Sequence, residues 1–400
     1  MKWWANPDVL DAMPEYLAEL YRALELTLLE EICKRLRVRD NLNQVTIADI
    51  KALRAHGVPL DEIKAAIRET TGLSERRLDA LIKDAVARNQ EYYSELITAS
   101  KLTAPDVLVG AAEVAAIRKQ TLDEIKNITR SMGFLVDAGR TMLAPARAYQ
   151  WALDSAVLQM ESGAISYGEA IETAIKQLAD SGLRTVDYES GRSDSVDVAV
   201  RRAVLTGVGQ LNDKYTDESA EYLDSPYVEV SAHAGARDKA KPHPWSSHKA
   251  WQGKVYYQSK HGEADPLGKY PDLVATTGYG EADGLNGINC RHSRHVWVEG
   301  VSERTYTDAQ LAALDPPPFE YQGQTYTHYE ATQQQRKIER TIRKLKREEA
   351  AYKSAGDKEQ LTLVRAKMRR LRQEYKDFSA AAGLRMQPER MKVYDLPKIT

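Results

Sequence analysis

The sequence predicts a mainly α-helical protein: a helical N-terminal body, one small α+β domain containing histidines and a cysteine, and a C-terminal helical hairpin. Three observations predict this fold class. Apolar residues recur at helical spacing before residue 226, histidines gather between residues 233 and 295, and two helical series follow residue 328. We expect five parts: an N-terminal helical region (1–140), a second helical region (141–226), a His/Cys-rich α+β domain (227–327), a basic coiled-coil hairpin (328–380) and a tail (381–400).

Length, charge and cysteine content limit the possible classes of protein. A chain of 400 residues is longer than one ordinary domain. Its formal net charge of -2 argues against a polybasic nucleic-acid binder as a description of the whole chain. Cys33 and Cys290 are the only cysteines, so we expect no disulfide framework and a reducing compartment. No apolar run approaches the roughly 20 residues that cross a bilayer, and no signal-peptide pattern opens the sequence.

The N-terminal region is expected to be helical throughout. After Pro14, apolar residues recur three or four positions apart, at Leu17, Leu20, Leu24, Leu28 and Ile32. Three short helices are expected next, at about 46–56, 60–71 and 74–98. Thr46 and Ser74 are placed as N-caps, and Gly72 is placed as a helix end.

These three short helices resemble a helix-turn-helix in outline, so DNA binding is one interpretation. The segment mixes Arg76, Arg77, Lys83 and Arg88 with as many acidic residues. Such a mixture is more typical of a solvated face than of a phosphate-binding face. We therefore favour a helical packing module.

The helical pattern continues to about residue 215 with clear start signals. Thr121 precedes an acidic residue by three positions, which is the spacing of a capping box. A helix is expected over 144–159, and Ser166 is expected to cap the next helix, over 168–179. Ser195 is placed to start the helix that follows.

The composition changes near Pro226. The segment 227–231 alternates like a strand, and a second short strand is expected over 254–258. Six of the eight histidines fall between residues 233 and 295, which marks a distinct domain. The stretch 261–283 is rich in Gly, Pro and Asp and is expected to form a long surface loop.

Four residues of this domain have metal-ligand side chains in two close pairs. His243 and His248 form an H-x4-H pair, and Cys290 and His292 form a C-x-H pair. Imidazole nitrogen and thiolate sulfur suit tetrahedral zinc, and a small loop-rich domain gains stability from such a link. The four residues are therefore candidate ligands of a structural zinc ion.

Two other interpretations of the histidines stay open. The side chains can hydrogen-bond the backbone within a small polar core. Alternatively, two histidines can act as acid and base in an RNase-like cleavage, with Arg237 or Lys254 stabilising the transition state. The sequence contains no HExxH, GxSxG or Walker motif, so the enzyme interpretation depends on the density of histidines alone.

The same domain resembles a known family. The run SAHAGARDKAKPHPWSSHKAWQGKVY, followed by GLNGINCRH, is similar to the phage minor capsid protein 2 family, which is related to the Mu F-like head morphogenesis proteins. The similarity covers roughly residues 140–300, including segments near 163–171 and 186–192. In the relatives a cysteine pair precedes Gly-Lys-Val-Tyr and an Asn-Cys-Arg-Cys segment follows. Here His248 and Trp245 stand at the first pair, Cys290 matches the next cysteine, and His292 replaces the last.

This resemblance implies a role in a tailed-phage virion. The family's proteins are low-copy head components that associate with the portal protein and other head proteins. They act in head assembly, DNA packaging or ejection, which places this chain in the phage head and, during assembly, in the host cytoplasm. The alternative function is a nuclease-like effector that is delivered with the genome and uses the His-rich domain.

The C-terminal part is expected to be a helical hairpin. Residues 333–353 carry one apolar series, and a second follows Gly356-Asp357 at spacings of three and four, which are the spacings of a coiled-coil seam. Residues 336–377 hold fifteen Lys/Arg against seven Asp/Glu. In one interpretation the basic side chains contact an anionic partner, which is packaged double-stranded DNA or an acidic portal surface. In the other they form a solvated face with intrahelical ion pairs.

Overall fold

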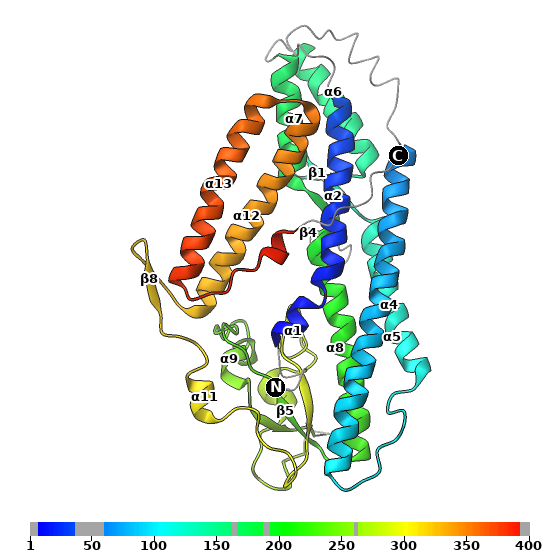
Figure 1. Cartoon of the computed structure of the whole chain (residues 1–400), viewed down its shortest axis with the longest axis vertical. Helices are drawn as coiled ribbons and strands as arrows, with labels where there is room; N and C mark the ends of the chain where they lie inside the picture. Colours follow the sequence, from blue (N-terminus) through cyan, green and yellow to red (C-terminus); the bar gives the residue numbers. More distant parts are fainter. Residues whose placement is uncertain (1–6, 37–59, 162–165, 187–192, 260–262, 393–400) are drawn as a thin grey trace. The chain divides into compact units, whose positions relative to one another are not determined.

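The computed structural model describes residues 7–36, 60–161, 166–186, 193–259 and 263–392, and these residues are mainly helical, as predicted (Figure 1). The chain divides into two compact units, each built from three stretches. Unit 1 comprises Met1–Tyr16, Arg76–Glu124 and Arg201–Gln334, and unit 2 comprises Leu17–Glu75, Ile125–Val200 and Gln335–Thr400. The units therefore group the five predicted parts differently: the range 1–140 contributes to both units, and most of the hairpin groups with earlier helices.

Unit 2 contains a helical core and a four-stranded antiparallel sheet that the sequence did not predict. The strand order is β2-β1-β3-β4. The strands are β1 (Gly133–Val136), β2 (Thr141–Leu143), β3 (Leu183–Val186) and β4 (Ser193–Ser195). The helices α6 (Pro145–Glu161) and α7 (Tyr167–Ser181) pack on each other and on β1. The apolar series of α2 (Glu15–Leu36) is buried at all five predicted positions, from Leu17 to Ile32.

The helix α7 begins at the predicted cap. Ser166 Oγ accepts a hydrogen bond from the Glu169 backbone N–H, and Glu169 Oε2 accepts one from the Ser166 N–H at 2.9 Å. This reciprocal pair is a capping box. The helix ends where Gly182, with φ of 61°, leaves the helical conformation. The parts of the family-like segments at 163–165 and 187–192 lie outside the described residues.

One long helix replaces two of the predicted short ones. The helix α4 runs from Leu60 to Ala99, so it continues through the predicted end at Gly72 and the predicted start at Ser74. Ser74 Oγ donates to the Thr70 carbonyl four residues earlier, at 2.7 Å, so it bonds within the helix interior and does not cap a new helix. Residues 60–99 are therefore one helix and not the last two helices of the predicted helix-turn-helix, whose first helix, at 46–56, lies outside the described residues.

The predicted start at Thr121 is also wrong. The helix α5 runs from Ala111 to Arg130, and Thr121 Oγ1 donates to the Ile117 carbonyl at 2.9 Å. By contrast, α8 (Val196–Tyr222) begins directly after Ser195, as predicted.

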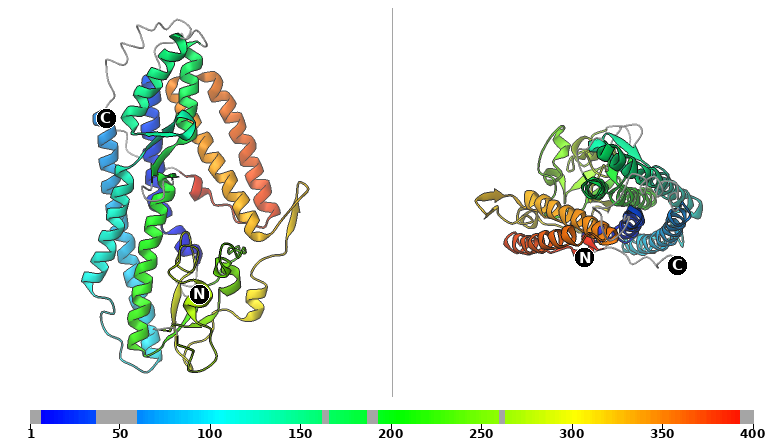
Figure 2. Two further views of the ribbon diagram at one scale, coloured as in Figure 1. Left: turned by 180° about the vertical axis from the view of Figure 1, so that it is seen from behind. Right: turned by 90° about the horizontal axis from the view of Figure 1, so that it is seen from above.

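The hairpin is confirmed as two helices, α12 (His328–Ala355) and α13 (Lys358–Ala381), which lie side by side in Figures 1 and 2. Gly356 takes a φ of 75° between them, and Asp357 caps α13 by accepting from the Gln360 N–H. Tyr375 OH donates to Glu339 Oε1 across the pair at 2.9 Å. The buried apolar residues of the pair include Ile338, Ile342, Leu345, Val364, Met368, Tyr375 and Phe378.

Unit 1 contains the predicted α+β part. Its three-stranded antiparallel sheet has the order β6-β5-β7, with β5 (Tyr227–Val230), β6 (Val255–Tyr257) and β7 (Arg294–Trp297). Both predicted strands are thus confirmed. The loop expected over 261–283 contains a short helix, α10 (Leu273–Thr277). The remaining small elements of unit 1 are α1 (Pro7–Ala12), α9 (His248–Trp251), α11 (Asp308–Ala312), β8 (Phe319–Tyr321), β9 (Gln324–Tyr326) and the 3-10 turn Pro244–Ser246.

An ion-pair network centred on a buried arginine joins this sheet to α8 within unit 1. Arg294 of β7 is 2% exposed and lies 3.0 Å from Asp213 and 2.8 Å from Asp217, both on α8. Tyr279 OH accepts a further hydrogen bond from the guanidinium at 2.8 Å. The segment that leads into β7 is thereby held against the helix, which positions the residues just before the strand. Among the described residues, no helix is both long and apolar enough to cross a membrane.

Candidate metal centre

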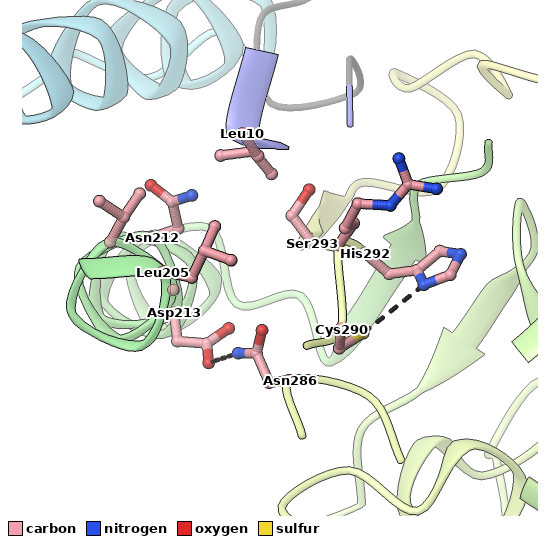
Figure 3. Close-up of a pocket in the computed structure, with 11 residues that line it drawn as sticks. Leu10, Leu205, Asn212, Asp213, Asn286, Cys290, His292 and Ser293 are labelled. Atoms are coloured by element: carbon pink, nitrogen blue, oxygen red, sulfur yellow. Dashed lines mark hydrogen bonds between the residues drawn. The ribbon is translucent and has the colours of Figure 1, made fainter. Parts of the chain in front are cut away.

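Three of the four predicted zinc ligands come together in unit 1. His248 is the first residue of α9, and Cys290 and His292 lie just before β7. Cys290 Sγ lies 3.8 Å from His248 Nδ1 and 3.5 Å from His292 Nδ1. The three ligand atoms all lie within 4.8 Å of one another. Figure 3 shows the approach of His292 to Cys290.

Both imidazoles are held with a defined nitrogen toward the sulfur. His292 Nε2 lies 3.0 Å from Gln252 Oε1, and His248 Nε2 lies 2.9 Å from the Asp283 carbonyl oxygen. These oxygens only accept, so each Nε2 carries the proton and each Nδ1 presents a lone pair to Cys290. The amide of Gln252 is itself oriented, because Oε1 also accepts from the His233 backbone N–H at 3.0 Å. Metal-binding histidines usually have such a partner on the other nitrogen.

The two sulfur–nitrogen distances fit a tetrahedral ion. Zinc bonds of about 2.3 Å to sulfur and 2.0–2.1 Å to nitrogen place neighbouring ligand atoms about 3.6 Å apart. The two observed separations from Cys290 Sγ, 3.5 and 3.8 Å, bracket this value. Hydrogen bonding alone explains the cluster less well, because one S–H cannot serve two imidazole acceptors.

Burial determines the protonation of the group. It lowers the pKa of His248 to about 4 and holds the pKa of His292 well below its usual range, so both rings are neutral near pH 7. Neutral imidazole is the form that binds metals. Burial also raises the pKa of the Cys290 thiol. A bound cation would reverse that effect by favouring the thiolate.

His243 does not join this group. Its side chain is 48% exposed, and its Nδ1 lies 3.0 Å from Asp283 Oδ2. Its ring stacks on Trp245, whose Nε1 donates to the same carboxylate at 3.1 Å. Hydrogen bonds from Ser246 and His243 hold the pKa of Asp283 well below its usual range. The structure thus separates the four predicted ligands into a close group of three and a histidine–aspartate pair.

His233 and Arg291 also lie beside the group. The His233 ring stacks on His292 with centroids 4.5 Å apart, and an Arg291 nitrogen lies 2.9 Å from its Nδ1. Burial and the Arg291 charge lower the pKa of His233 to about 3. Gln252 and Asp283 could not be identified from the sequence, because an amide oxygen and a main-chain carbonyl give no residue-type signal for metal support.

A pocket of unit 1 borders the group. Cys290 and His292 line it together with α8 residues and Asn286 (Figure 3). Asn286 Nδ2 donates to Asp213, which also accepts from Tyr279 OH at 3.0 Å. The sulfur therefore faces both the two imidazoles and this pocket.

Comparison of the chain with known proteins shows the family to which it belongs. The model of the phage minor capsid protein 2 family matches residues 5–380, nearly the whole chain. The chain therefore belongs to the phage minor capsid protein 2 family, which confirms the resemblance seen in the sequence. It is also similar to a structural protein of Lactococcus phage LL-H, at 24% identity over 314 residues, covering 77% of this chain and 78% of that protein. No solved structure matches.

Proposed function

We propose that this phage structural protein is a minor head component that binds the portal protein and acts in head assembly, DNA packaging or ejection. The observation that carries the proposal is the family match over residues 5–380, which includes both compact units and the hairpin. A match of this extent applies to the whole chain and not to one shared module. Partners among other phage head proteins are expected for any member of such a family.

An exposed basic surface on α13 supports an anionic partner. It consists of Lys367, Arg369, Arg370, Arg372 and Lys376, which are all exposed, and of Arg365, which is exposed but pairs with Glu349 of α12 at 2.8 Å. On α12, Arg347 pairs with Glu25 and Lys344 pairs with Asp180, whereas Lys337, Arg340 and Lys353 are exposed. Exposed basic residues are therefore more numerous on the second helix.

The α13 basic surface also supports contact with packaged double-stranded DNA. Lys and Arg side chains that contact phosphates release condensed counterions, so such binding weakens steeply with salt. Each lost contact reduces the slope of log K against log salt by about 0.9. This salt dependence separates a DNA contact from a contact with an acidic protein surface.

The test compares two sets of charge changes. In one variant Lys367, Arg369, Arg370 and Arg372 become Gln; in the matched control the exposed α4 residues Lys64, Arg68, Arg76 and Lys83 become Gln. We expect the wild type and the control to co-purify with the portal ring of the same phage, and the α13 variant to be depleted. Failure of the wild type to bind the portal ring would refute the portal role. Equal DNA affinity for both variants would refute the DNA contact.

The nuclease-like alternative receives less support from the site. His233 and His248 have pKa values lowered to about 3 and about 4 by burial, whereas RNA cleavage needs an acid and a base that titrate near neutral pH. Lys254 donates to the Ala250 carbonyl at 2.8 Å. Cleavage of RNA or DNA by the purified chain, abolished when His233, His243 and His248 become Ala, would replace the structural proposal with this one.

A further inference from the structure

We propose that His248 Nδ1, Cys290 Sγ and His292 Nδ1 bind one zinc ion as a site with three protein ligands. The inference is independent of the role in head assembly. Two imidazole nitrogens and one thiolate form a donor set of intermediate softness, which favours zinc over magnesium or calcium. The three atoms belong to segments 42 residues apart in sequence, so the ion would link α9 to the approach of β7.

The ligand side chains are held in orientations that suit a bound cation. Each imidazole has its Nε2 proton committed to an oxygen, at 3.0 Å for His292 and 2.9 Å for His248. The free lone pairs therefore converge on Cys290, where only one thiol proton is available. A zinc ion satisfies both lone pairs and the sulfur, and the two sulfur–nitrogen separations already match a tetrahedral edge.

The fourth position is left to water. His243, the remaining predicted ligand, has its Nδ1 3.0 Å from Asp283 Oδ2, and its side chain is 48% exposed. The pocket that Cys290 and His292 line gives water and the metal a route to the sulfur.

Gln252 is a positioning residue for this site. Its Oε1 accepts from His292 Nε2 and from the His233 backbone N–H, so it sets the tautomer and direction of the ligand ring. Loss of such a partner typically weakens metal binding about 10- to 100-fold. Gln252→Glu keeps an acceptor at this position, whereas Gln252→Leu removes it. We expect only the second change to weaken zinc affinity by that factor.

The experiment is metal analysis of the full chain after reconstitution with zinc and removal of excess metal. We expect about one zinc per wild-type chain and per His243→Ala chain, and less than about a tenth of an equivalent for Cys290→Ser and for His248→Ala. Circular dichroism verifies that each variant keeps the helical content of the wild type.

Cobalt substitution keeps the inference testable if a ligand variant does not fold. The wild-type cobalt form should show thiolate-to-cobalt charge transfer and the intense visible bands of a tetrahedral site, and Gln252→Leu should need more cobalt than Gln252→Glu to reach them. Wild-type protein with less than about a tenth of an equivalent of zinc would overturn the site. Full zinc content in Cys290→Ser, or equal loss in His243→Ala, would overturn the assigned ligands.

Discussion

Arg347 of α12 lies 3.4 Å from Glu25 of α2, although the two residues are 322 positions apart in sequence. Arg347 Nε also donates to the Ala179 carbonyl at 2.8 Å, and Glu25 accepts from the Leu183 N–H at 2.6 Å. Both side chains are at most 14% exposed. The first helix of the hairpin is therefore built into the core of unit 2 through charged groups as well as apolar ones.

Breaking this pair is expected to destabilise unit 2. Arg347→Met leaves a buried carboxylate without its cation, and loss of one partner of a buried pair costs about 3 kcal/mol. Burial raises the pKa of Glu25, so the carboxyl can respond by taking up a proton. We expect Glu25→Gln to cost less in the Arg347→Met background, with a coupling of about 1 kcal/mol or more in urea unfolding. Strictly additive effects would show that the contact does not stabilise the fold.

The stability of unit 2 should also depend on pH through Asp197. Burial raises the pKa of Asp197, but Arg343 and Arg22, at 3.9 and 3.6 Å, outweigh burial and lower it. A carboxyl with a lowered folded pKa contributes stability above its unfolded value of about 3.9, and this is lost as pH falls through the folded value. Wild type and Asp197→Asn should therefore differ most near neutral pH.

The measurement for Asp197 is the free energy of unfolding of both proteins at several pH values. The difference between them should shrink once the pH falls below about 4. A difference that stays constant from pH 7 to pH 3 would mean that the charge of Asp197 contributes nothing.

Gly278 supports the surroundings of the proposed metal site. It ends α10 in the left-handed conformation, with φ of 60°, and a Cβ added there would overlap the indole of Trp245. Gly268 has a similar φ of 63° with no described atom within 4 Å of the added Cβ. Both Ala variants carry the backbone cost of about 1 kcal/mol, but only Gly278→Ala adds an overpacking cost of about 1–3 kcal/mol. Thermal unfolding should separate the two, and equal transition temperatures would contradict the packing of Trp245.

Zinc removal should weaken unit 1 if the proposed site binds the ion. A ligand that binds only the folded state stabilises it by about 2.7 kcal/mol at a hundredfold excess over its dissociation constant. We expect a strong chelator to lower the unfolding temperature of the wild type and of His243→Ala, and to leave that of Cys290→Ser unchanged. A chelator effect of the same size in Cys290→Ser would assign the stabilisation to another site.

The sequence predicts elements whose signal is long and regular, and it misses those whose signal is short. The series from Leu17 to Ile32 and the hairpin seam extend over several turns, so their period is clear. The strands β1 to β4 have three or four residues each, and β1 pairs with β3 about 50 residues away, as in Gly133↔Arg184. No alternation is detectable over so few residues, and the pairing depends on tertiary contacts.

The candidate site shows the same limit. Residue type was sufficient to name His248, Cys290 and His292 as candidate ligands, because few side chains bind metals, and the fold brings these three together. Spacing could not exclude His243, because the sequence does not indicate which way a side chain points. The supporting oxygens of Gln252 and Asp283 could be found only from the fold.

Ser166 and Ser74 provide a direct test of why one start signal was correct and the other was not. Both serines precede helical patterns, but Ser166 caps a backbone N–H, whereas Ser74 donates to a carbonyl inside α4. Ser166→Ala should therefore cost about 1 kcal/mol, because it leaves an N–H at the helix end without its partner. Ser74→Ala should change stability by less than about 0.5 kcal/mol, because the Thr70 carbonyl keeps its position in a continuous helix and Ala favours that helix. Urea unfolding of the two variants gives both values, and a larger loss for Ser74→Ala would indicate that residues 60–99 depend on a cap at this position.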